Sequence, residues 1–149
     1  MKEKIEIFDK LILSLNGKIE QAQESIAVVK ESRDNETKSS AGDKYETGRE
    51  MMQIEINKSE DQLSKFINYK HQLSKIDLKK KFVKVEFGSL VETSNGTYFI
   101  SIALGKIKLA NTDYYPISLA SPIGKLIYQK KEGDSIEFQG RIFKIIRIN

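Results

Sequence analysis

The sequence predicts an α+β protein, in which an antiparallel coiled-coil hairpin precedes a small antiparallel β-sheet domain with one short helix. Apolar residues recur every three or four positions in the first half of the chain and at every second position in the second half. A polar segment at residues 33–44 interrupts the first pattern. We therefore place the coiled coil at residues 1–81, its tip at about 34–46, and the sheet domain at 82–149.

The first helix is predicted over residues 3–33. Its apolar positions alternate steps of three and four, which is typical of a helix packed along one long partner. They are Ile5, Phe8, Ile12, Leu15, Ile19, Ala22, Ile26 and Val29, with Ile7 and Leu11 widening the stripe near its start. Gly17 falls inside the helix without changing the phase of the pattern.

The second helix is predicted to begin near Asp43. Its weaker stripe keeps the same phase and consists of Tyr45, Met52, Ile56, Leu63, Phe66 and Leu73. Two helices of matched length joined by a short polar turn indicate an antiparallel hairpin.

From Phe82 the period changes to two. Strands are predicted over residues 82–87, after Gly88, beyond an Asn95-Gly96 turn, and over 106–109 and 114–119. Ser121-Pro122 is typical of a helix start, and we expect a short helix through about residue 129. A final hairpin is predicted over 135–138 and 142–148.

Composition excludes several functions. The absence of cysteine rules out disulfides, thiolate zinc sites and cysteine nucleophiles, and favours the cytoplasm. No run approaches the roughly 20 apolar residues of a membrane span, so we expect no membrane partner. The net charge of +4 is mild. For the run Lys79-Lys80-Lys81 we favour solvated lysines in a linker over a nucleic-acid surface.

Asp43 and Glu46 are candidate ligands for a metal ion at the tip. Carboxylates three residues apart lie on one face of a helix and can share a hard cation such as Mg²⁺. An Asp followed three residues later by Glu is also close to a capping box. The spacing of Asp43 and Glu46 by itself favours the cap, whereas the matched helices and the Ser121-Pro122-Ile123-Gly124 segment favour the metal site. The two roles are compatible.

No other constellation points to a self-contained enzyme. His71 is the only histidine, and a surface or packing role is favoured for it. The sequence has no Gly-x-Ser-x-Gly elbow and no phosphate-cradling glycine motif. Ser121-Pro122-Ile123-Gly124 is read locally as a helix start, although the same residues could form a docking surface.

Four short segments resemble the bacterial Gre-type transcript cleavage factors, the GreA and GreB family. Ser121-Pro122-Ile123-Gly124 followed by Lys130-Lys131-Glu132-Gly133-Asp134 is similar to the family's Ser-Pro-Ile-Gly and Lys-Lys-x-Gly-Asp segments. Gly42-Asp43-Lys44-Tyr45-Glu46 resembles its Gly-Asp-x-x-Glu tip, and Phe87-Gly88-Ser89-Leu90-Val91 is similar to the start of its C-terminal domain.

The resemblance implies an FKBP-like second domain that docks on RNA polymerase through Ser121, Pro122, Ile123 and Gly124. It also implies that the coiled coil enters the secondary channel, where Asp43 and Glu46 act as catalytic carboxylates on Mg²⁺ shared with the polymerase. Backtracked nascent RNA would then be cut by the polymerase itself. The chain would be a monomeric accessory factor with no intrinsic cofactor.

The tip departs from the family pattern after the second carboxylate. The family commonly continues Asn-Ala-Glu-Tyr, whereas this chain has Thr47-Gly48-Arg49-Glu50, and Ala120 replaces the asparagine before Ser-Pro. Two alternatives therefore stay open. One is a Gre-like regulator that occupies the channel without stimulating cleavage, and the other is a coiled-coil scaffold unrelated to polymerase.

Overall fold

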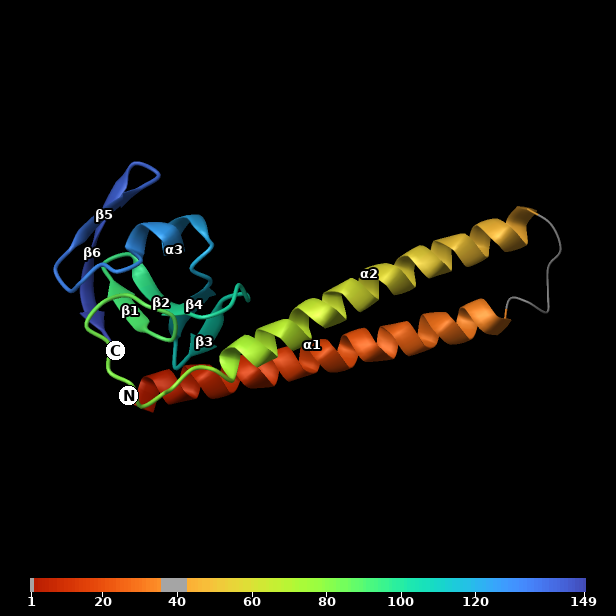
Figure 1. The fold of residues 1–149 in the computed structure, drawn as a ribbon, viewed down its shortest axis with the longest axis horizontal. Helices are drawn as coiled ribbons and strands as arrows, with labels where there is room; N and C mark the ends of the chain where they lie inside the picture. Colours follow the sequence, from red (N-terminus) through yellow and green to blue (C-terminus); the bar gives the residue numbers. More distant parts are fainter. Residues whose placement is uncertain (1, 36–42) are drawn as a thin grey trace. The chain divides into compact units, whose positions relative to one another are not determined.

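The structure, a computed structural model, describes residues 2–35 and 43–149, with the side chains of residues 43–45 excluded (Figure 1). Helices α1 (Lys2–Asn35) and α2 (Asp43–Leu73) form a hairpin and are followed by a sheet with one short helix, α3 (Pro122–Ile127). The predicted α+β class is confirmed. The chain separates into two compact units, one made of Met1–Ile12 with His71–Asn149 and the other of Leu13–Lys70.

The unit of residues 13–70 contains most of the helical hairpin. Its buried apolar residues include Ala22, Ile26 and Ile56, all on the predicted stripes. Arg33 Nη1 donates a hydrogen bond of 2.7 Å to Gln53 Oε1, and Lys30 Nζ lies 3.6 Å from Glu60 Oε1. These contacts link α1 to α2, so polar groups as well as apolar ones hold the hairpin together. No helix in the described ranges is both long and apolar enough to cross a membrane.

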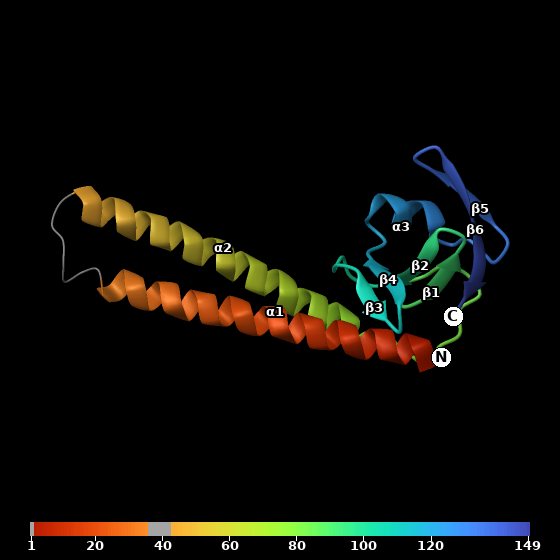
Figure 2. The same ribbon diagram turned by 180° about the vertical axis from the view of Figure 1, so that it is seen from behind.

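The other unit contains a six-stranded sheet (Figures 1 and 2). Its strands are β1 (Leu90–Thr93), β2 (Gly96–Ile100), β3 (Ile107–Leu109), β4 (Thr112–Ile117), β5 (Ser135–Phe138) and β6 (Arg141–Ile148). Their order across the sheet is β3-β4-β2-β1-β6-β5. All neighbours are antiparallel except β2 and β4, which pair in parallel with Thr97 opposite Tyr114.

The sheet has apolar side chains on both faces, since successive strand residues point to opposite sides. Val91 and Tyr98 belong to the core cluster that also holds Ile127 of α3. Leu90 and Phe99, which face each other in the register of β1 and β2, are also buried. A sheet that is buried on both faces needs a second covering element besides α3.

The start of α1 provides this second cover. Tyr114 donates a hydrogen bond to Glu3, and Lys10 donates one to the Lys108 carbonyl oxygen. Ile7 and Leu11 are fully buried, whereas Ile5 is 44% exposed. The predicted centre of the stripe at Ile5 is therefore wrong at this end of the helix, whereas Ile7 and Leu11, predicted to widen the stripe, are the buried residues, because these turns of α1 pack beside β3 and β4.

Two further expectations about the second half need correction. The predicted strand at 82–87 is absent, and only Lys84 forms an isolated bridge, to Lys131. Phe82 and Val85 are buried in the core while Val83 is 77% exposed, so burial in this segment does not follow the predicted alternation. The sheet is also not wholly antiparallel, because the chain passes through β3 before β4 pairs with β2.

Lys4 is fully buried in the same unit, although its charge predicts exposure. Its Nζ donates a hydrogen bond of 3.3 Å to the Asn149 carbonyl oxygen and lies 4.6 Å from the centre of the Phe82 ring. Desolvation lowers the pKa of Lys4 from 10.5 to about 8, and the charge of Asp77 opposes part of that change. The ammonium group therefore makes the folded state less stable than a neutral group would.

We expect Lys4→Met to stabilise the protein at about pH 7, because the thioether keeps the apolar stem and removes the buried charge. The whole change in pKa, from 10.5 to about 8, would correspond to about 3.5 kcal/mol at about 1.4 kcal/mol per unit, and because solvent screens part of this charge we expect a gain of roughly 1–3 kcal/mol. In the parent, the unfolded chain binds more protons than the folded chain between about pH 8 and 10.5, so this group makes stability rise with pH across that window. Urea unfolding of both proteins from about pH 7 to pH 10 checks the difference.

Lys2→Met is the matched control, because Lys2 lies on the same helix and is exposed. Burial raises the pKa of Tyr114 to about 12, and the hydrogen bond to Glu3 adds to this. Tyr114 therefore makes the free energy of unfolding fall above about pH 10 in the parent and in both variants. Its contribution is the same in all three proteins, so it does not affect the difference between them. An unchanged pH slope in Lys4→Met would contradict a charged, buried Lys4.

Candidate functional site

The predicted tip lies partly outside the described residues. Residues 36–42 are not described, and α1 ends at Asn35 while α2 begins at Asp43. Asp43 is thus the first residue of α2, and its side chain falls outside the described part. The backbone places Glu46 three residues later on the same helix, as the spacing predicts.

Glu46 lies at the edge of a shallow groove on the surface of α2. The groove has a volume of about 470 Å³ and is lined by Glu46, Arg49, Glu50 and Gln53. Their spacings of three, four and seven place them along one face of the helix. Glu46 is exposed and has no hydrogen bond or ion pair within the described ranges, so its carboxylate is available to an external cation.

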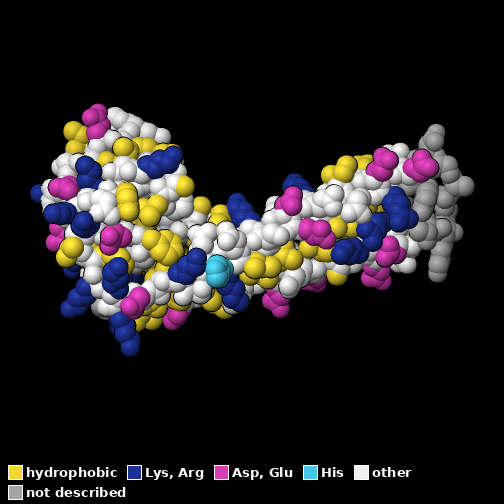
Figure 3. Space-filling view, viewed as in Figure 1, with side chains coloured by type: hydrophobic (Ala, Val, Ile, Leu, Met, Phe, Trp, Pro, Cys, Tyr) yellow, Lys and Arg dark blue, Asp and Glu magenta, His cyan; other side chains and the backbone are white. Residues whose placement is uncertain are grey.

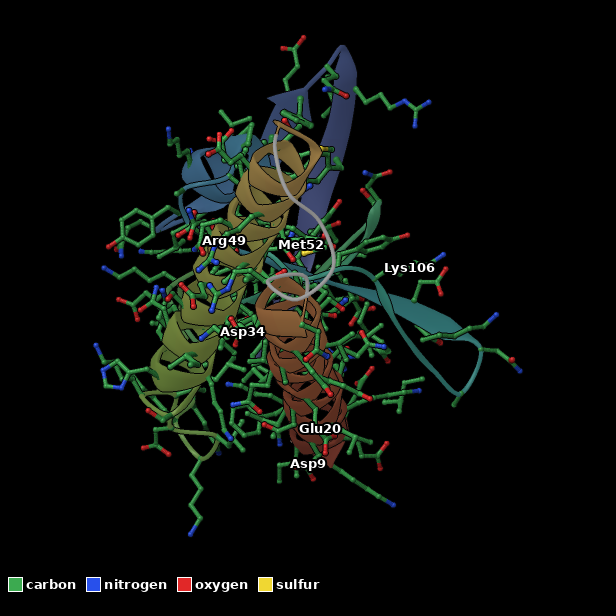
Figure 4. All side chains as sticks on the ribbon, turned by 90° about the vertical axis from the view of Figure 1, so that its right-hand side faces the viewer. Asp9, Glu20, Asp34, Arg49, Met52 and Lys106 are labelled. Carbon is green, nitrogen blue, oxygen red and sulfur yellow. The ribbon has the colours of Figure 1, made fainter. Side chains whose placement is uncertain are left out.

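Hydrogen bonds between side chains fix the position of Gln53 at the other end of this groove. Arg33 bonds to Gln53, and Gln53 Nε2 donates a hydrogen bond of 3.0 Å to Asn57 Oδ1. Arg33 Nε also lies 3.2 Å from Asp34 Oδ1. Figure 4, which looks along the hairpin, labels Arg49 on α2 and Asp34 on α1. Sequence reasoning missed Arg33, Glu50 and Gln53, although helical spacing from Glu46 would have found the two on α2.

The described side chains fit Mg²⁺ only in part. No group of three or more histidine, cysteine or acidic side chains that could hold a metal occurs in residues 2–35 and 46–149. The exposed carboxylate of Glu46 suits one position around a hard cation, but Arg49 lies one turn away and brings a positive charge to the same face. A cation bound here would need most of its ligands from another molecule.

The predicted docking segment is the start of α3. Ser121 is the N-cap, with its Oγ accepting a hydrogen bond of 3.0 Å from the Gly124 amide and donating one of 2.7 Å to the Ser118 carbonyl oxygen. Pro122 is exposed, and Ile123 is partly buried against the core. The segment therefore combines a fixed backbone with the exposed ring of Pro122. This arrangement is compatible both with a helix cap and with a docking surface.

Gly124 is buried and has a structural role of its own. A Cβ atom at this position would lie well inside contact distance of the Ser118 carbonyl oxygen and close to Ser121 Oγ. His71, the other residue weighed for chemistry, is exposed near the end of α2, where its carbonyl oxygen accepts a hydrogen bond from Ser74.

We expect Gly124→Ala to destabilise the protein by about 1–3 kcal/mol, because the methyl group would push against backbone atoms that cannot move freely. The same substitution at Gly17 has the opposite sign. No atom lies within 4 Å of the Cβ position there, and alanine favours the helix by about 0.5–1 kcal/mol. Urea unfolding followed by circular dichroism measures both, and equal effects at the two positions would contradict the steric role of Gly124.

Comparison with models of protein families finds no match for the chain, and comparison with curated protein sequences finds none either. Function therefore has to be argued from the residues and their geometry.

Proposed function

We propose that this protein is an accessory factor that binds RNA polymerase at its secondary channel and stimulates Mg²⁺-dependent cleavage of backtracked RNA. In this proposal the polymerase supplies the active site, and the protein is not an enzyme by itself. The hairpin enters the channel, while the Ser121–Gly124 segment contacts the polymerase at its rim.

One observation carries the proposal most directly. Glu46 presents an exposed carboxylate without an internal partner in the described ranges, on the turn of α2 that follows Asp43. It does so on a hairpin of two helices with 34 and 31 residues, each about 50 Å long at 1.5 Å per residue. An unpaired acid at the end of such a hairpin suits a group that is delivered into another molecule.

The residues would divide the work in the following way. Asp43 and Glu46 would each offer carboxylate oxygens to Mg²⁺ in the polymerase site. The metal would supply a nucleophilic water and stabilise the leaving oxygen in phosphodiester hydrolysis. Ser121 would hold the backbone of the docking segment, so that Pro122 meets the polymerase without reordering.

The test compares the parent with Asp43→Asn/Glu46→Gln on purified elongation complexes that have been halted and backtracked. We expect cleavage to fall by about 100-fold or more, because amides are poor replacements for anionic metal ligands. Binding to core polymerase in a pull-down should stay nearly unchanged. Short 3′ RNA fragments on a denaturing gel measure cleavage.

Glu31→Gln/Asp61→Asn is the matched control, because it also removes two exposed acids from the hairpin. It should cleave like the parent. Undiminished cleavage by the Asp43/Glu46 variant would refute the role of the tip carboxylates. A parent that forms a stable dimer and binds no polymerase would favour a scaffold function instead.

Arg49 favours a second candidate function, a regulator that occupies the channel without stimulating cleavage. It lines the same groove as Glu46, where a guanidinium group opposes the binding of a cation. This alternative predicts that the parent competes with other channel-binding factors but releases no RNA fragments. It also predicts that Arg49→Gln gains cleavage, whereas Arg141→Gln, an exposed arginine of the sheet unit, does not.

A further inference from the structure

Six lysines belong to two segments of the sheet-containing unit that are distant in the sequence and joined by backbone contacts. The segment before β1 contributes four of them and the segment between α3 and β5 contributes two. We call this set the basic patch, and its members are Lys79, Lys80, Lys81, Lys84, Lys130 and Lys131. All are exposed except Lys84, which is partly buried. Sequence reasoning considered only the first three, which by themselves are a short run in a linker.

Backbone contacts hold the two segments together. Lys84 and Lys131 form an isolated antiparallel bridge. The Val85 amide donates a hydrogen bond of 2.9 Å to the Lys130 carbonyl oxygen, and the Gln129 amide donates one of 2.8 Å to that of Val85. Figure 1 shows the green segment before β1 running beside the blue segment that follows α3. Lys84, Lys130 and Lys131 are thus held close together next to the fully buried Val85, and Lys79, Lys80 and Lys81 precede them in the same anchored segment.

The two segments of the basic patch carry six lysines against four carboxylates, so positive charge is in excess. None of the six ammonium groups forms an ion pair within the described residues. The four carboxylates offset part of the positive charge, and each also accepts a hydrogen bond from an amide. They are Asp77 from the Lys79 amide, Glu132 from the Ile148 amide, Asp134 from the Lys131 amide, and Glu86 from the Gln129 side chain.

An aromatic side chain borders the basic patch. Tyr128 follows the last residue of α3 and is 49% exposed, although its neighbour Ile127 is fully buried. Gln129 adopts a φ of 66°, which is uncommon for a residue other than glycine, and the chain turns there to bring Lys130 beside Val85. Figure 3 shows hydrophobic, basic and acidic side chains interspersed on the visible face of this unit.

We propose that the basic patch and Tyr128 bind single-stranded nucleic acid. Lysine ammonium groups match the charge of successive phosphates, and a tyrosine ring provides a surface on which a base can stack. The patch contains no arginine for paired hydrogen bonds to base edges, so binding should tolerate any sequence. An acidic peptide would use the lysines but gain little from an exposed aromatic ring, which is why nucleic acid is favoured.

The test measures fluorescence anisotropy of labelled oligouridine and oligothymidine of about 20 nucleotides, titrated with the full chain at several salt concentrations. The patch variant carries Lys80→Gln, Lys81→Gln, Lys130→Gln and Lys131→Gln. We expect its affinity to fall at least about tenfold, and the slope of log K against log salt to become about 2.8 less negative, since each phosphate contact contributes about 0.7.

The control variant carries Lys18→Gln, Lys58→Gln, Lys65→Gln and Lys70→Gln in the hairpin. It removes the same charge from exposed positions, and Lys65 lies over the Tyr69 ring as Lys80 lies over the Phe82 ring. Its affinity should stay within about threefold of the parent. Tyr128→Ala should weaken binding about fivefold or more, whereas Tyr128→Phe keeps the ring and should bind like the parent.

Several outcomes would overturn the proposal. Undetectable binding at low salt, or equal losses in the patch and control variants, would show that the lysines form no specific surface. A polyglutamate peptide or anionic vesicles that bind more tightly than the oligonucleotides, with the loss confined to the patch variant, would identify a different partner. A preference for oligouridine over oligothymidine, or the reverse, distinguishes RNA from DNA as the source of the phosphates. These measurements need no polymerase, so their failure is independent of the function proposed above.

Discussion

Burial of the first turns of α1 is the constraint on which the rest of the sheet-containing unit depends. The sheet is apolar on both faces, and one six-residue helix, α3, can cover only one of them. Ile7 and Leu11 supply apolar surface from the opposite end of the sequence, and bonds to Tyr114 and the Lys108 carbonyl fix their position. A polar substitution in these turns should therefore weaken the sheet as much as the helix.

Lys4 shows what this arrangement costs. It lies on the face of α1 that carries Ile7 and Leu11, so the packing that covers the sheet also removes an ammonium group from water. The Phe82 ring and the Asn149 carbonyl oxygen replace part of its hydration. Phe82 belongs to the segment that carries four of the six lysines of the basic patch, and its burial fixes that segment on the core. The buried Lys4 and this segment therefore both depend on the Phe82 side chain.

The two proposed surfaces obey different physical requirements. At the tip, Glu46 and Asp43 offer too few ligands to hold Mg²⁺ without a partner, so any chemistry there depends on a second molecule. In the basic patch, backbone hydrogen bonds join the two segments at Val85 and Lys130, and none of the six lysines forms an ion pair in the described residues. Each of the two surfaces can be tested without the other.

The sequence by itself determined the elements with strong local signals. Heptad spacing predicted both helices of the hairpin, Ser121-Pro122 predicted the cap of α3, and the pattern over residues 135–148 predicted the last hairpin. These signals are local because a cap, a turn or a helical stripe involves residues only a few positions apart. The resemblance at the tip likewise singled out Glu46, which the structure places on the surface.

Only the tertiary structure decided which face of α1 is buried at its start, the parallel pairing of β2 with β4, and the loss of the strand predicted at 82–87. It also decided that Lys84 and Lys131, which lie far apart in the sequence, share one surface. Each of these depends on contacts between distant residues, which compete with the local pattern and can reverse it. The apolar periodicity of a segment predicts which of its faces can be buried, but the element that packs against the segment determines which side chains are buried.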